Sequence, residues 1–272
     1  MLSGSNTVLI GALALALSTG VRAQQNEILR PKDVRITHFE ELKYPPAAQF
    51  AQGVVVVRVN YDKRGQVVQA EALSGNETLV PDSLANVRTW QFQPNTSRTA
   101  IVVYNFRISP GVCTTARSFF TFDQPNLVTI TACKPATPQS SMPAAAPQAA
   151  QIMVNDKDVE VLSFEDLRYP PLAAQARIAG IVVVQAKLDE KGTVVEASAL
   201  FGHAMLVAVT LDNVKQWKFR PNAERLAVFV YNFKLACAGD IYNQDWRQFV
   251  LELPNFATAT APLMMVETET SR

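Results

Sequence analysis

An internal repeat constrains this chain more than any other feature of its sequence. The segment from Gly53 to Asn95 matches the segment from Gly180 to Asn222 at an offset of 127 residues, with about half of the positions identical. Upstream of this segment the offset is 125 residues, and Tyr44-Pro45-Pro46 matches Tyr169-Pro170-Pro171. Each repeat is about as long as a domain, which indicates a duplicated domain and not a solenoid of short units.

The repeat divides the chain into five parts. We expect a signal peptide in residues 1–23, a first domain in 30–133, a linker in 134–151, a second domain in 153–262 and a tail in 263–272. The linker is rich in Pro, Ala, Ser and Gln and has no acidic residue, which is typical of an extended, solvated connector. We therefore expect two domains that reorient independently.

The N-terminus has the pattern of an export signal. A short apolar run over residues 8–21 is followed by Val21-Arg22-Ala23, whose first and last residues are small enough for a signal peptidase. This pattern predicts cleavage after Ala23. The alternative is an uncleaved anchor, which would place the chain at a membrane, although the run is shorter than the roughly 20 apolar residues that a spanning helix needs.

Export makes disulfides available to the three cysteines. Cys113 and Cys133 flank a segment with strand-like alternation, and we expect these two to be bonded to each other. Cys237 would then remain as a free thiol or an intermolecular link. Three reduced, buried cysteines are the alternative.

The same order of elements is expected in both repeats. A short helix after the Tyr-Pro-Pro step precedes two alternating strands, joined by the turns Asp62 to Gly65 and Asp189 to Gly192. A helix with an apolar stripe ending in Trp90 or Trp217 follows, and then a third strand. We therefore expect an α+β fold of two tandem small domains, each a three-stranded antiparallel sheet packed with two helices in the order α-β-β-α-β. An added C-terminal strand, from the match of residues 120–132 to 249–261, stays open as an extension.

Composition and motifs exclude several classes of protein. The chain has 25 Lys and Arg residues against 24 Asp and Glu residues, which gives no basic surface for a nucleic acid. Neither His38 nor His203 lies in a metal-binding spacing, and no nucleophile motif or phosphate loop is present. We expect no metal, no cofactor and no enzyme activity.

The ordered motifs resemble the C-terminal domain of TonB, the energy transducer that serves outer-membrane receptors. The second repeat is the more similar, with Tyr169-Pro170-Pro171, Gly180, the turn from Asp189 to Gly192, and Trp217-Lys218-Phe219-Arg220-Pro221. The first repeat keeps Tyr44-Pro45, Gly53, Gly65 and Trp90-Gln91-Phe92-Gln93-Pro94. The resemblance implies a periplasmic protein of TonB-dependent transport.

The resemblance also implies recognition of an extended peptide, a TonB-box segment of an outer-membrane receptor, which adds as a strand at the edge of the third strand of the domain. The residues predicted to line these two edges alternate away from the expected core: Ile101, Val103, Asn105 and Arg107 in the first repeat, and Val228, Val230, Asn232 and Lys234 in the second. The alternative is that these side chains only form the solvent-exposed outer face of each sheet and bind nothing. An added strand over the edge would block the peptide.

A second class of function stays open beside peptide recognition. The duplication equally suits a structural protein of the envelope that associates with itself through sheet edges, forming a homodimer, without transducing energy. The short linker favours binding over force transmission, because it cannot span a periplasm of a few hundred ångströms at about 3.1 Å per residue.

Overall fold

The computed structural model of the chain describes residues 28–46, 48, 51–109, 117–133, 159–236, 248–253 and 255–263. Of these residues, 50% lie in strands and 14% in helices. The protein is therefore mostly β, and the expectation of two α+β domains with two helices each is wrong. The signal peptide, the whole linker and the tail beyond Leu263 lie outside the described residues and stay predictions.

Each repeat forms a mixed five-stranded sheet instead of a three-stranded antiparallel one. In the first repeat the strand order is β3-β2-β5-β7-β6, built from β2 (Gly53–Tyr61), β3 (Val67–Ser74), β5 (Thr99–Ile108), β6 (Arg117–Gln124) and β7 (Leu127–Cys133). In the second repeat the order is β10-β9-β12-β14-β13, built from β9 (Gly180–Leu188), β10 (Val194–Phe201), β12 (Leu226–Ala236), β13 (Phe249–Leu253) and β14 (Phe256–Pro262). The three strands expected in each repeat are present, but two further strands extend each sheet.

The added strands form a hairpin that enters the sheet in an unexpected direction. β7 pairs parallel with β5, and β14 pairs parallel with β12, while β6 and β13 lie outermost and antiparallel to them. An asparagine at the hairpin turn fixes this register, because the backbone N–H groups of Val103 and Val230 each donate to an asparagine carbonyl, of Asn126 and Asn255, at 2.8 Å. The turn of the hairpin is thus anchored near the middle of the third strand.

The helices are short and lie on one face of each sheet. α1 (Val80–Val87) packs on β2 and β3, and α3 (Ala204–Val214) packs on β9 and β10. The second repeat also has α2 (Pro171–Gln175), which begins with Pro171 in the first turn, where proline costs no hydrogen bond. No such helix is assigned to the described residues after Tyr44-Pro45-Pro46 in the first repeat, although residues 47, 49 and 50 lie outside the described set.

Two small ribbons and one helical turn complete the described part. β1 (Ile36–His38) pairs with β4 (Gln91–Phe92), and β8 (Val161–Ser163) pairs with β11 (Lys218–Phe219). A 3-10 turn, η1 (Pro31–Asp33), precedes β1. These ribbons hold the segment before each Tyr-Pro-Pro step against the residues after each tryptophan.

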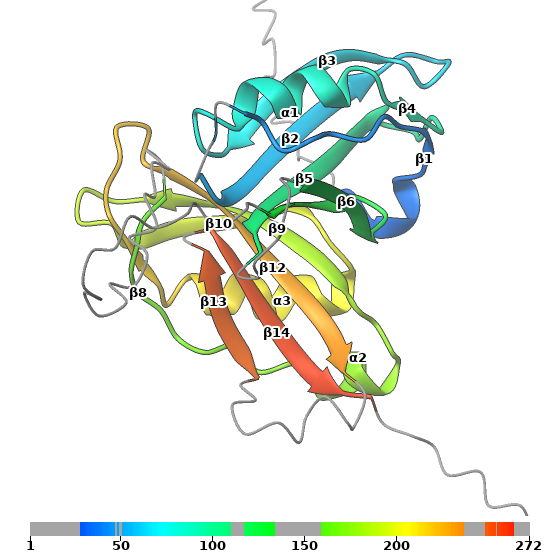
Figure 1. Cartoon of the computed structure of the whole chain (residues 1–272). Coiled ribbons are helices and arrows are strands. Elements are labelled where there is room, and N and C mark those ends of the chain that lie inside the picture. The colour runs from blue at the N-terminus through cyan, green and yellow to red at the C-terminus, as the bar shows by residue number, and fades with distance from the viewer. Residues whose placement is uncertain are drawn as a thin grey trace, which may run out of the picture.

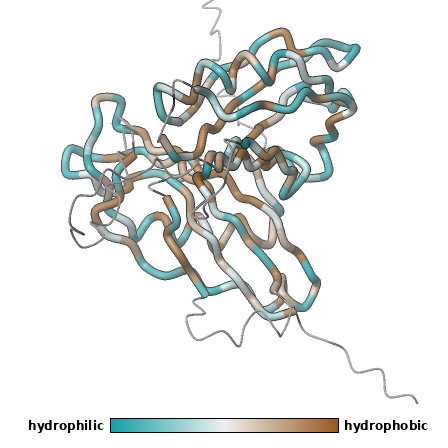
Figure 2. The backbone as a smooth tube through the Cα atoms, viewed as in Figure 1, coloured by the Kyte–Doolittle hydropathy of each residue, from teal (hydrophilic) through white to brown (hydrophobic). Residues whose placement is uncertain are grey.

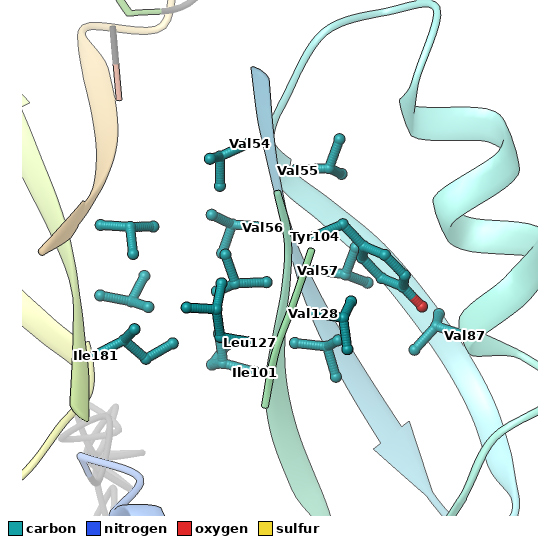
Figure 3. Packing of buried hydrophobic residues seen from close by; sticks show 14 of the residues in the cluster. Val54, Val55, Val56, Val57, Val87, Ile101, Tyr104, Leu127, Val128 and Ile181 are labelled. Carbon is teal, nitrogen blue, oxygen red and sulfur yellow. The ribbon is translucent and has the colours of Figure 1, made fainter. Parts of the chain in front are cut away.

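The two sheets face each other and share a core. Figure 1 shows the first-repeat sheet under α1 and the second-repeat sheet beside it, with α3 on the far side, so the order of layers is helix, sheet, sheet, helix. In Figure 3, Val54, Val56, Ile101 and Leu127 point toward Ile181 of the other repeat. The side chains that point toward α1 are those of Val55, Val57, Tyr104 and Val128. Figure 2 shows apolar residues along the strands of both sheets. Because one buried cluster combines residues of both repeats, the expected independence of the two domains is wrong.

A buried asparagine joins the helix, the tryptophan and the sheet in the same way in each repeat. In the second repeat the Asn213 amide nitrogen donates to the Glu165 carbonyl at 2.9 Å, and its oxygen accepts from Trp217 Nε1 and from the Tyr231 hydroxyl, both at 3.0 Å. Asn86 makes the corresponding bonds to Glu40, Trp90 and Tyr104. Polar atoms of two large buried side chains are satisfied by one amide, which fixes the tryptophan orientation.

Buried tyrosines predict a loss of stability at high pH. Burial raises the pKa of Tyr44 and of Tyr169 to about 12, whereas an unfolded tyrosine has a pKa of about 10. Between these values the folded state keeps protons that the unfolded state has lost, so the free energy of unfolding must fall as pH rises from about 10 to 12. Urea unfolding at stepped pH measures this fall, and Tyr169→Phe should reduce its slope. Ionisation of every tyrosine near pH 10 in the folded protein, followed by absorbance at 295 nm, would contradict it.

Candidate functional site

The strands predicted as open edges are interior strands of their sheets. β5 pairs with β2 on one side and β7 on the other, and β12 lies between β9 and β14. The prediction of a free peptide-binding edge at these strands is therefore wrong in this structure. The physical reason is that the hairpin after each third strand supplies the backbone partners that a peptide would have supplied.

The predicted side chains lie instead between the two sheets. Those buried there are Ile101, Val103, Asn105, Val228, Val230 and Asn232. Arg107 is partly exposed, and Lys234 is exposed at the end of its strand. The alternation that separates these residues from the helix-facing core is as predicted, but the face they form is covered by the other repeat and not by solvent.

Polar members of this face form bonds across the interface. Arg107 donates to Glu252 at 2.6 Å and to Asn105 at 2.8 Å, and its guanidinium lies 5.6 Å from the centre of the Phe256 ring. From the other direction, Gln124 of β6 donates to Asn232 at 2.8 Å. Both outer hairpins therefore bond to the opposite sheet, which holds the two repeats in one relative position.

Each of these asparagines also begins a short chain of bonds within its own sheet. Asn105 donates to Thr129 at 3.1 Å, and the Thr129 hydroxyl donates to Asp123. In the second repeat Asn232 donates to Thr258 at 3.4 Å, and Thr258 donates to Glu252. These polar groups are thus paired, as burial requires. The Asn255 amide nitrogen likewise donates across the interface, to the Val54 carbonyl and the Ser74 hydroxyl, but the Asn255 side-chain oxygen is buried without a hydrogen-bond partner among the described residues.

The edges that remain are the outermost strands of each sheet. The first sheet has one edge at β3 and the opposite edge at β6, and the second sheet has its two edges at β10 and β13. The N-terminal segment already uses one end of β10, because Leu29 donates to the Leu200 carbonyl at 3.3 Å and accepts from the Gly202 amide at 3.0 Å in a parallel bridge. The edge of a second-repeat strand thus accepts added backbone in this fold.

A groove follows the edge of β13. It has a volume of about 700 Å³ and lies between β13 and the irregular segment 164–168. Phe164 forms part of one wall, with its ring centre 5.6 Å from that of Trp217 and 6.1 Å from that of Phe249, and it is 40% exposed. The groove is therefore open to solvent along a strand edge and backed by an aromatic cluster.

The backbone of β13 presents free groups to this groove. Thr260 donates to the Gln248 carbonyl at 2.7 Å, and Val250 lies opposite Thr258. Because the pairs of an antiparallel ladder alternate, Gln248 and Val250 bond toward β14, whereas the N–H and C=O groups of Phe249 and Leu251 point away from it, toward the groove. This strand edge can take an extended segment.

The histidines and cysteines have structural surroundings. His38 is exposed at the end of β1, and His203 caps α3, where its Nδ1 accepts from the Met205 amide at 3.3 Å. Cys133 is disulfide-bonded, while Cys113 and Cys237 lie outside the described residues, so the predicted pairing with Cys113 stays a prediction. In the described ranges no three His, Cys, Asp or Glu side chains gather as metal ligands, and no helix is long and apolar enough to span a bilayer.

Sequence comparison places the second repeat beside a known class of domain. Residues 165–235 match the family model described as Gram-negative bacterial TonB protein C-terminal. The match runs from the segment that lines the groove to the penultimate residue of β12, so the hairpin of β13 and β14 lies beyond it. The match supports a TonB-like protein in general, and it does not extend to the first repeat.

No curated protein and no solved structure gives a significant match to the chain.

Several residues of the groove and of the interface between the repeats have no recognisable pattern in the sequence. The β13 groove, Gln124 and Glu252 gain their roles from the parallel entry of the hairpin and from the contact between repeats. One signal was present, because Asn86 and Asn213 occupy matching positions four residues before each tryptophan. That spacing lets the amide near the end of each helix reach the indole, which lies just after the helix.

Proposed function

We propose that this protein is a periplasmic TonB-like binding protein that takes up an extended segment of an outer-membrane receptor by strand addition, without catalysis. The family match to residues 165–235 supports the TonB-like class. The observation that carries the proposal is the β13 edge, whose Phe249 and Leu251 backbone groups face an open groove beside Phe164. Backbone bonds would supply affinity, and the aromatic wall would select apolar side chains.

The receptor segment would pair with the outer hairpin and not with the third strand. In a domain that ends at residue 235, the edge of β12 would be free, but here β14 occupies it over the seven pairs from Val230–Phe256 to Ala236–Pro262. A peptide at β12 would first have to displace this strand. Addition at β13 leaves every existing strand pair intact, which is the smaller cost in free energy.

A peptide titration followed by backbone NMR tests this assignment. With a seven-residue TonB-box peptide, we expect saturable shifts of the Phe249 and Leu251 amides and of residues 164–168, with β14 unchanged. Leu251→Pro removes one outward donor and should abolish the shifts, since an edge strand accepts proline where its N–H faces outward. Val250→Thr is the matched control, because it keeps the backbone donors and its side chain is already 40% exposed.

Two outcomes would contradict the proposal. One is the lack of any shift at millimolar peptide. The other is a response of residues 228–235 together with loss of the β14 pairing, which would return the peptide to the third strand. Retained β14 amide signals in Leu251→Pro show that the variant is folded.

Self-association through the β3 and β10 edges is the second candidate. Matching valines at the outer strands, Val68 on β3 and Val195 on β10, are 68% and 65% exposed. Exposed β-branched residues on an edge strand favour pairing with another strand. Sedimentation over a hundredfold range of concentration separates the two functions, because a mass that rises with concentration favours a structural assembly.

A further inference from the structure

A second cavity lies in the first repeat, away from the β13 groove. It has a volume of about 920 Å³. Its walls come from the N-terminal segment 28–36, from the turn 93–97 and from the end of the β6–β7 hairpin, residues 122–125. This volume is within the range of pockets that hold small organic ligands.

One wall of the cavity is aromatic. Phe39 and Phe122 meet there edge to face, with ring centres 4.7 Å apart, and they remain 40% and 37% exposed. Trp90 lies behind them, with its ring centre 6.3 Å from Phe39 and 5.8 Å from Phe122. Exposed rings held by a buried tryptophan form a rigid surface for an apolar group.

The charged groups that line the cavity are two cations and one carboxylate. Lys32 and Arg35 have no ion pair within the described part of the chain, and Arg35 donates only to the neutral Gln93 oxygen at 3.2 Å. The carboxylate of Asp33 accepts from the Arg30 backbone amide at 3.2 Å, and this bond caps the N-terminus of η1. The lining therefore carries a net positive charge.

The second repeat shows that this positive charge is not required by the fold. The backbone N–H of Gln93 donates to the Arg35 carbonyl at 2.8 Å, and the backbone N–H of Arg220 donates to the Glu160 carbonyl at 2.7 Å. The two pairs therefore occupy equivalent positions. The second pair is an ion pair, with nitrogen and oxygen 2.9 Å apart. The same backbone frame thus carries a neutralised charge in one repeat and an uncompensated guanidinium in the other.

The side-chain amide of Asn95, in the lining of the cavity, is already used. Asn95 donates to the carbonyls of Asp33 and Thr99, and its oxygen accepts from Ser97 and from the Thr99 amide. A ligand rich in hydroxyl groups would find few free partners among these side chains, and unpaired polar groups are costly to bury. A carboxylate, by contrast, would meet two cations.

We propose that this cavity binds a carboxylate attached to an aromatic or apolar body. Lys32 and Arg35 hold the carboxylate, and Phe39 and Phe122 contact the apolar body. A free aromatic acid and an acidic peptide segment present this same chemistry. The site is separate from the β13 groove, so it does not depend on the receptor segment.

Paired probes test the proposal on the purified full chain by backbone NMR. The first pair is N-acetyl-phenylalanine, which carries a carboxylate, and its neutral amide; the second is acetyl-Phe-Asp-Phe-amide and its neutral Asn counterpart. We expect shifts in residues 31–36 and 93–97, with each neutral probe about tenfold weaker, because a bond to a charged group is worth more than a neutral one. Preference for the tripeptide over the free acid identifies a peptide as the natural ligand, and the reverse identifies a small acid.

Variants separate the two halves of the site. Arg35→Gln should reduce the preference for the charged probes, because only Lys32 remains to hold the carboxylate, and Phe122→Ala should weaken charged and neutral probes together. Arg220→Gln, at the equivalent pair of the second repeat, should change neither. Equal binding of charged and neutral probes, an unchanged preference in Arg35→Gln, or saturation by inorganic phosphate as tight as by the aromatic acids would each overturn the proposal.

Discussion

Replacement of Val230 by Asp should cost about 4 kcal/mol or more of the free energy of unfolding. Val230 is fully buried on β12, in the cluster that combines residues of both repeats. A carboxylate there loses its hydration and gains no partner, and an uncompensated buried charge costs several kcal/mol. Equilibrium unfolding in urea measures the change.

The matched control lies on the same strand. Lys234→Asp makes a larger change of charge at an exposed position, and we expect a change within about 0.5 kcal/mol. If Val230→Asp cost as little as the control, the two sheets would not be packed against each other in solution. The comparison therefore tests the shared core directly.

The second large effect is expected at Asn213. Asn213→Ala removes one amide donor and leaves the Trp217 N–H and the Tyr231 hydroxyl buried without their common acceptor. Each unsatisfied buried group costs about 1–3 kcal/mol, so we expect a loss of about 3–5 kcal/mol in the free energy of unfolding. Urea unfolding, with tryptophan fluorescence as the signal, gives this value.

A smaller substitution in the same cluster calibrates this result. Tyr231→Phe removes one donor and leaves the amide oxygen with Trp217, so it should cost about 1 kcal/mol. Equal losses in the two variants would show that the asparagine does not act as a shared acceptor.

The alternation of apolar and polar residues predicts where the strands lie in the sequence but not which strands pair with each other. Alternation in the sequence indicates the strands β2, β3 and β5 and their counterparts, and the match of residues 120–132 to 249–261 indicates an added strand. A single strand pattern carries no information on which strand it joins or in which direction. The parallel entry of β7 and β14 depends on contacts far along the chain, and for this reason a small antiparallel sheet was expected.

The sequence of the face toward the other repeat does not reveal that the face is buried. Asn105, Arg107 and Asn232 interrupt rows of valines, and such a mixed face is typical of a solvated surface. In the structure, each polar group is paired by a residue of the hairpins, such as Glu252 or Gln124. The proline-rich linker equally suggested separation, but linker composition does not exclude contact between the domains that it joins.

The bridge between Leu29 and Phe201 has a consequence for the order of folding. The two bridged residues are separated by about 170 residues of sequence, so this contact carries one of the largest loop-closure costs in the described structure. Hairpins such as β2–β3 can form as soon as their own residues are available, whereas the N-terminal bridge must wait until β10 is in place. The pairing of Leu29 with β10 should therefore form late in folding. Residues 28–30 should be the first part of the sheet to exchange their amide protons with solvent.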